Sequence, residues 1–185
     1  MKIFKLAAIA AGLAVCISCS SDKPDNTNHY LQEMTGRYRL SEIYTDEAVD
    51  LNYDGVANTD LFIEMDCIEW PFVFYTAQVQ HLSDDYIPLS YNVPVNSRPE
   101  PYPSMQCFSP GSMFYNLDVN RNNGSISVVD GNLVDNETEL ERGKLEVVNY
   151  NNDTLRLEFN RRLMTRHGWQ NFRFYMTFGK DPSLN

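Results

Sequence analysis

The chain has 185 residues, enough for one domain with a buried core. Its formal net charge of -10 provides no basic stripe along which a phosphate backbone could bind, which argues against nucleic acid as a partner. Tyr and Phe are plentiful, with 11 and 10 residues, and no amphipathic pattern continues for more than a few helical turns, so we expect an all-β protein.

The chain begins with the pattern of an export signal. Two lysines precede an apolar run, residues 6–15, which is too short to span a bilayer as a helix. Ser18-Cys19 follows, and a small residue directly before a cysteine resembles the lipobox of bacterial lipoproteins. This resemblance implies that residues 1–18 are removed as a signal peptide and that Cys19 is acylated, which would form a stable lipid anchor. A plain secretory signal, without a lipid, is the alternative.

Residues 19–28 contain no apolar side chain after the cysteine, and we expect them to be a solvated tether for a domain that spans residues 29–185. Asp22, an acid close behind the lipidated cysteine, resembles the surface-export signal of Bacteroidetes lipoproteins. The expected location is therefore the outer membrane, and the export signal implies the cell surface. Removing the signal peptide takes away two lysines and no acid, so the formal charge moves from -10 to -12 and the lipid is the only expected contact with the membrane.

The first expected elements of the domain are a short helix and a strand. Residues 28–35 offer Asn28 as a cap and enough apolar side chains for one or two helical turns, which a glycine ends. Residues 36–45 then predict a strand, with Tyr38 and Leu40 on one face.

An acidic loop, residues 50–60, follows this strand and has the spacing of an EF-hand-type calcium loop. Side-chain oxygens occupy positions one, three, five and nine, a backbone carbonyl occupies position seven, and a carboxylate falls one residue before the usual closing position. The candidate calcium ligands are Asp50, Asn52, Asp54, Val56, Asn58 and Asp60. The alternative is a turn in which the Asp and Asn side chains bond their own backbone, and the sequence leaves both interpretations open.

A short helix and a disulfide are expected after the loop. Asp60 can cap a helix over residues 61–65, and Cys67 lies just beyond it. Cys107 is the other cysteine of the mature chain, and export to an oxidising space favours a disulfide between the two. Closing a loop of about 40 residues would stabilise the fold by roughly 4 kcal/mol. Two buried free thiols are the alternative.

From residue 71 onward, nearly every segment has the pattern of a strand bounded by turn residues. The expected strands are residues 71–82, 86–95, 106–120, 125–129, 144–150, 155–159 and 169–178. Asn123-Gly124 predicts a type I′ hairpin turn, which needs positive φ at both central residues. Without crossover helices, these segments predict an all-β, antiparallel up-and-down meander of about eight to nine strands that closes into a barrel. A two-sheet sandwich is the alternative.

Several of these features together resemble the lipocalin-like lipoproteins of Bacteroidetes. They are the meander, the lipobox, the acidic loop and the opening Gly36-x-Tyr38-x-Leu40, which stands where lipocalins have a Gly-x-Trp signature. The resemblance implies a lipocalin-like barrel that binds a small apolar ligand. It also implies that a basic residue of the last strand packs across the signature aromatic ring, which would place Arg173 over Tyr38.

The sequence contains no nucleophile elbow, zinc-protease helix, phosphate loop or dinucleotide fingerprint, so we expect a protein that is not an enzyme. In the last strand, Phe172, Phe174 and Phe178 share one face and either line a ligand cavity or fill the core. Two functional hypotheses follow. The first is a binding module for a small apolar or glycan-like ligand, with Ca²⁺ as a structural ion. The second is a structural or assembly subunit of an envelope complex, with a filled core.

Overall fold

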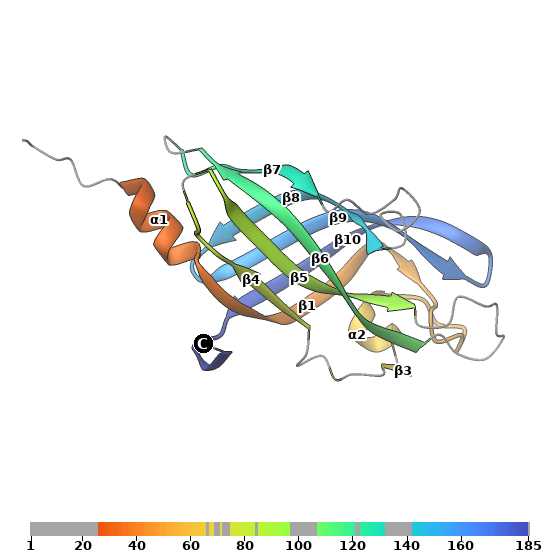
Figure 1. Ribbon diagram of the computed structural model, residues 1–185. Coiled ribbons are helices and arrows are strands. Elements are labelled where there is room, and N and C mark those ends of the chain that lie inside the picture. The colour runs from red at the N-terminus through yellow and green to blue at the C-terminus, as the bar shows by residue number, and fades with distance from the viewer. Residues whose placement is uncertain are drawn as a thin grey trace, which may run out of the picture.

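The computed structural model describes residues 26–65, 67–68, 71, 75–83, 85–96, 107–120, 123–131 and 142–184, which form a mostly β structure with two short α-helices (Figure 1). The predicted signal peptide, Cys19 and the greater part of the tether lie outside this set, so their assignments stay predictions. Within the set, no helix is long and apolar enough to cross a membrane.

All ten strands of the described residues belong to one sheet. They are β1 (Gly36–Val49), β2 (Asn58–Asp60), β3 (Cys67–Ile68), β4 (Thr76–Val79), β5 (Ile87–Asn96), β6 (Cys107–Val119), β7 (Ile126–Gly131), β8 (Lys144–Asn151), β9 (Thr154–Thr165) and β10 (Gly168–Lys180). The helices are α1 (Asn26–Met34) and α2 (Leu61–Glu64), with a 3-10 helix at Pro182–Leu184. The expectation of short helices near the N-terminus is confirmed.

The predicted antiparallel meander is confirmed in its main part, but the described residues form ten strands where about eight to nine were expected. Neighbouring strands follow the order β6-β5-β4-β1-β10-β9-β8, so the first long strand lies between β4 and the last strand. β2 pairs with β1, and β7 extends the meander by pairing antiparallel with β6. β3 instead pairs parallel with the start of β6, which makes the sheet mixed.

The predicted closure into a barrel is wrong. β7 and β8 lie side by side (Figure 1), but no main-chain pairing joins them among the described residues, and the sheet stays open along this seam. Both flanking ladders carry a register shift, in β6–β7 and in β8–β9. Such shifts bend a strand and interrupt its hydrogen bonding, which is a physical reason for an open seam.

A tyrosine side chain of β6 reaches the backbone at the start of β8. The Tyr115 hydroxyl on β6 accepts a hydrogen bond from the Leu145 N–H at 3.2 Å. It donates to the Gly143 carbonyl oxygen at 3.3 Å. Because buried backbone groups need partners, this one hydroxyl satisfies both a backbone acceptor and a backbone donor where β8 begins.

The β6–β7 hairpin is present, but the predicted type I′ turn at Asn123-Gly124 is wrong. Of these two residues only the glycine has positive φ, at 69°. Successive positive φ angles occur instead at Asn152, 47°, and Asp153, 60°, between β8 and β9. Short polar side chains tolerate the left-handed region, so this turn forms without glycine.

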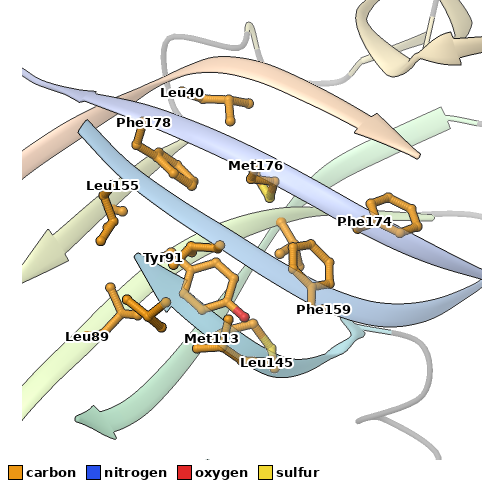
Figure 2. Close-up of a cluster of buried hydrophobic side chains, with 14 of the residues drawn as sticks. Leu40, Leu89, Tyr91, Met113, Leu145, Leu155, Phe159, Phe174, Met176 and Phe178 are labelled. Carbon is orange, nitrogen blue, oxygen red and sulfur yellow. The ribbon is translucent and has the colours of Figure 1, made fainter. Parts of the chain in front are cut away.

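Inward side chains fill the space enclosed by the sheet (Figure 2). The alternation predicted for the last strand is confirmed, with Phe172, Phe174 and Phe178 of β10 buried. Phe159 of β9 stacks on Phe174 with ring centroids 5.3 Å apart. The Tyr91 ring of β5 lies 6.2 Å from that of Phe159. These rings pack on one another, as expected for a filled core rather than for the lining of a cavity.

The two helices cover opposite ends of this core (Figure 1). α1 buries Leu31 and Met34, and the Tyr38 hydroxyl donates to the Met34 carbonyl oxygen. At the other end, Leu61 of α2 and the adjoining Met65 are buried. Apolar side chains therefore close the enclosed space at both ends.

The predicted contact between Arg173 and Tyr38 is wrong. The register of β1 with β10 pairs Tyr38 with Lys180, close to α1. Arg173 lies further back along β10, where its guanidinium is 3.5 Å from the Glu146 carboxylate and 3.4 Å from that of Glu158. Strand register thus separates the two side chains along the sheet, and alternation places them on opposite faces.

A disulfide joins Cys67 of β3 to Cys107 of β6, with Cα atoms 4.5 Å apart. These are the two cysteines expected to pair. The same residues form a register pair of the parallel β3–β6 contact. The bond therefore holds the segment that follows α2 against one of the longest strands of the sheet.

Candidate functional site

The acidic loop after β1 folds as successive turns that satisfy their own backbone. Asn52 Oδ1 accepts from the Asp54 N–H at 3.1 Å, and Asp54 Oδ1 accepts from the Val56 N–H at 2.7 Å. Asp50 Oδ2 accepts from the Gly55 N–H at 3.1 Å. Asn and Asp side chains commonly form such turns. These hydrogen bonds match the alternative interpretation of the loop, a turn in which the Asp and Asn side chains bond their own backbone.

The end of the loop is held by α2. Asn58 Oδ1 accepts from the Asp60 N–H at 3.0 Å, and Asp60 Oδ1 accepts from the Phe62 N–H at 2.9 Å, which is the predicted N-cap. Glu64 of α2 is buried, and its Oε2 accepts from the Leu51 N–H at 3.0 Å. The helix therefore fixes both the end and the beginning of the loop.

A guanidinium group from the β9–β10 turn lies against the same loop. Arg166 Nε is 3.4 Å from Asp50 Oδ2, and Arg166 Nη2 donates to the Tyr53 carbonyl oxygen. The guanidinium carbon also lies 5.3 Å from the centre of the Tyr53 ring. A cation of the chain itself therefore balances part of the acidic charge, and the sequence did not indicate this partner.

Within the described ranges, no group of three or more His, Cys, Asp or Glu side chains is placed to hold a metal ion. Several loop oxygens accept from backbone N–H groups, and Asp50 Oδ2 faces Arg166, an arrangement typical of self-bonded turns. The other carboxylate oxygen, Asp50 Oδ1, is buried and has no hydrogen-bond partner among the described residues. Calcium binding by the six candidate ligands stays a prediction.

Because Glu64 is buried, we predict that the stability of the folded protein depends on pH. Burial, with a smaller effect of Asp50, raises the pKa of the Glu64 carboxyl above its ordinary value of 4.5. The folded state therefore holds this proton more tightly than the unfolded chain. Its contribution to stability is full below the unfolded pKa and is lost as pH rises through the folded pKa. We expect Glu64→Gln to be more stable than the wild type at neutral pH, with a difference that shrinks in acid, measured by urea unfolding across this range.

Glu64→Ala is the control for this experiment. It leaves the Leu51 N–H without its acceptor and should cost about 1–3 kcal/mol at every pH, whereas the Gln variant keeps a carbonyl oxygen there. A Gln variant that is less stable than the wild type at neutral pH would contradict the prediction. It would show that the ionised carboxylate is needed in the folded protein.

A separate groove, of about 510 Å³, lies on the outer face of β1, β10, β9 and β8. Its lining side chains include Tyr44, Tyr175, Arg156, Glu158, Asn149 and Asn151. Because β10 and β9 lie between β1 and β8, the tyrosines stand on one side of the groove and the asparagine amides on the other. The charged side chains of β9 lie between them.

The two tyrosines form a stacked pair. Tyr44 and Tyr175 are partners in the β1–β10 register, and their ring centroids are 4.8 Å apart with an interplanar angle of 14°. Tyr44 is 40% exposed. Each ring limits the motion of the other, so the pair offers a rigid aromatic surface to a ligand at low entropic cost.

The charges on β9 differ in their surroundings. Glu158 lies 3.4 Å from the Arg173 guanidinium, which balances its charge. Arg156 is exposed and forms no ion pair with another described residue. The groove therefore presents a fork of guanidinium donors beside amide groups that both donate and accept. It is suited to a ligand with many polar groups.

A second groove, of about 220 Å³, lies over β1, β4, β5 and β6 and includes the half-exposed Phe114. Its polar groups are partly bonded to one another, since Ser112 Oγ lies 3.1 Å from Asn92 Oδ1. It is smaller than the first groove.

Comparison with known protein families, curated proteins and solved structures gives no match. Membership of the lipocalin-like lipoproteins therefore stays a prediction, and the function has to be argued from the groove itself. The sequence showed that Tyr175 faces away from the phenylalanines of the last strand, but it did not indicate Tyr44 or Arg156 as neighbours. The missing information was the pairing of β10 with β1 and β9.

Proposed function

We propose that this protein is a lipid-anchored, non-enzymatic binding module of the outer membrane that holds a glycan-like ligand in the groove over β1, β10, β9 and β8. The observation that carries the proposal is a stacked tyrosine pair facing an exposed Arg156 and amide groups across one groove. A sugar ring has an apolar face of C–H groups and a rim of hydroxyls. Aromatic surfaces and planar hydrogen-bonding groups are therefore the side chains that suit it.

The packed core supports an outer site for such a ligand. An apolar ligand of the lipocalin type would need space between the inward side chains, where Phe159, Phe174 and Tyr91 already pack together. The order of the strands, with β1 between β4 and β10, still supports a lipocalin-like relationship. The proposal therefore retains the architecture and moves the ligand from the interior to the outer face.

The positions of α1 and of the β9–β10 turn, at opposite ends of the sheet, support membrane anchoring. Lipidated Cys19 and the tether would lead into α1, whereas the β9–β10 turn lies at the opposite end of the sheet (Figure 1). The groove face would then extend away from the membrane along β9 and β10. A ligand outside the cell could reach it without crossing the lipid surface.

The test uses the mature chain with Cys19→Ser, which prevents acylation. We expect a glycan array of neutral and acidic oligosaccharides to identify a bound class, with affinity then measured by calorimetry. Arg156→Ala should weaken binding about tenfold or more, because hydrogen bonds to a charged group contribute about 1.5–3 kcal/mol. Tyr86→Ala is the matched control, because it removes an exposed ring between β4 and β5, outside the groove. Absence of binding to every glycan would contradict the proposal.

A structural or assembly subunit of an envelope complex is the second candidate function. The filled core favours it, because such a subunit needs no ligand cavity. It predicts a stoichiometric complex with another envelope protein after crosslinking in the membrane, and Arg156→Ala should leave that complex unchanged.

Calcium in the acidic loop is retained as a separate structural proposal. If the loop binds Ca²⁺, adding the ion to chelator-treated protein should raise Tm by mass action, and Asp54→Asn should reduce that rise. An unchanged Tm at millimolar Ca²⁺ would contradict it and leave the self-bonded turns as the full account of the loop.

A further inference from the structure

The outer face that forms the groove continues along the β9–β10 hairpin. Successive residues of a strand point to opposite faces, so the outward residues of β10 after Tyr175 are Arg173, Asn171 and Trp169, toward the turn. β9 and β10 pair without a register shift from Trp169 to the groove. One continuous surface therefore joins the tyrosine pair to a tryptophan.

Trp169 is a second aromatic surface on this face. It is 39% exposed, although a large apolar side chain usually avoids water, and the Arg162 guanidinium carbon lies 4.9 Å from the centre of its ring. Arg162 is also an outward residue, on β9. The cation holds the ring in place on the strand surface, as Tyr44 holds Tyr175 in the groove.

The span between the two aromatic surfaces is long. Trp169 lies six positions before Tyr175, and at about 3.3 Å per residue this corresponds to roughly 20 Å along the strand. This is far more than one sugar unit spans, but several linked units would reach from one surface to the other.

The surface between them is polar, and its charges are balanced in part. Arg173 lies 3.5 Å from Glu146 and 3.4 Å from Glu158, and Asn160 Nδ2 donates to Glu146 Oε1 at 2.6 Å. One guanidinium is shared by two carboxylates there, so a chain of hydroxyl-bearing units that lies across these groups would meet both hydrogen-bond donors and acceptors. An extended apolar ligand would have to desolvate them.

We infer that the groove is one end of an extended site for a linear oligosaccharide, whose far end stacks on Trp169. This inference rests on the proposed function and specifies its ligand as a chain of several sugar units. A peptide that adds as a strand in the groove could pair only with β8, at the edge of the sheet, and would not lie across the tyrosine pair, because β9 and β10 have a strand on each side. Alternating aromatic and polar surfaces suit the alternating C–H faces and hydroxyls of a sugar chain.

The experiment measures how affinity depends on chain length. Calorimetry on the mature Cys19→Ser protein would use cello-, malto- and xylo-oligosaccharides and oligogalacturonides, each from disaccharide to hexasaccharide. For the class that binds, we expect affinity to rise with length until the chain reaches Trp169. Trp169→Ala should weaken the longest ligand about tenfold and leave the disaccharide unchanged. Tyr86→Ala, which removes a ring outside this face, should change neither.

The outcomes separate this inference from the proposed function. Equal affinity for short and long chains of the wild type overturns the extended site, whatever the stability of the variant, and leaves the groove as a short site. The inference is also overturned if Trp169→Ala is folded by circular dichroism and its affinity still rises with chain length as much as that of the wild type. Failure of every oligosaccharide to bind overturns the proposed function and this inference with it.

Discussion

Replacing both Cys67 and Cys107 with alanine should lower the free energy of unfolding by about 4 kcal/mol. The disulfide closes a loop with a sequence separation of 40, so its loss releases a long segment of the unfolded chain from constraint. In the folded protein it also releases the short β3 strand, which has only two register pairs with β6. Urea unfolding would measure the loss.

Cys19→Ser is the matched control for this experiment, because it removes the cysteine that is expected to carry the lipid and leaves the disulfide intact. It should unfold like the unlipidated wild type. Reduction of the wild type should reproduce the loss seen in the double-alanine variant and should have no effect on that variant. A double variant within about 1 kcal/mol of the wild type would contradict the prediction, and would indicate that the β3–β6 contact holds without the covalent bond.

The second large effect is expected at Gly143, directly before β8. Its φ is +100°, which residues with a Cβ rarely adopt, and a Cβ built there would lie 2.4 Å from Cδ2 of Phe159. Phe159 stacks on Phe174 in the core and has little space to move. We expect Gly143→Ala to cost about 3 kcal/mol or more, from backbone strain together with overpacking. Thermal unfolding would show the loss as a lower Tm.

Gly168→Ala is the matched control that measures the cost of backbone strain alone. Its φ is +92°, close to that of Gly143, but a Cβ there would meet no atom within 4 Å. Gly168→Ala should therefore cost only about 1 kcal/mol, from strain alone. The difference between the two variants measures the contact with Phe159. Equal losses would contradict the packing argument and leave strain as the common cause.

Gly143 also lies at the open seam, where its carbonyl oxygen accepts from the Tyr115 hydroxyl. Any movement of the backbone to relieve the clash with Phe159 would disturb this bridge. The packing of Phe159 and the hydrogen bond between β6 and the start of β8 are therefore coupled at one residue. This coupling explains why the expected loss exceeds that of an ordinary turn glycine.

Several features that depend on near neighbours in the chain were predicted correctly from the sequence, although the turn type at Asn123-Gly124 was not. The phenylalanines of β10 share a buried face because successive strand residues point to opposite sides. Asp60 caps α2 because its carboxylate reaches an N–H group only two residues away. The short α1 and the pairing of the only two cysteines of the expected mature chain also required no knowledge of the other strands.

Features that depend on contacts between distant segments were decided only by the tertiary structure. Alternation states which face a side chain takes, but it does not specify which strand lies beside it. The register of β1 with β10 placed Lys180 opposite Tyr38 and Tyr175 opposite Tyr44, and the β9–β10 turn brought Arg166 to the acidic loop. The open seam and the groove have the same origin, because each requires strands from several parts of the chain to meet, and no local pattern encodes that meeting.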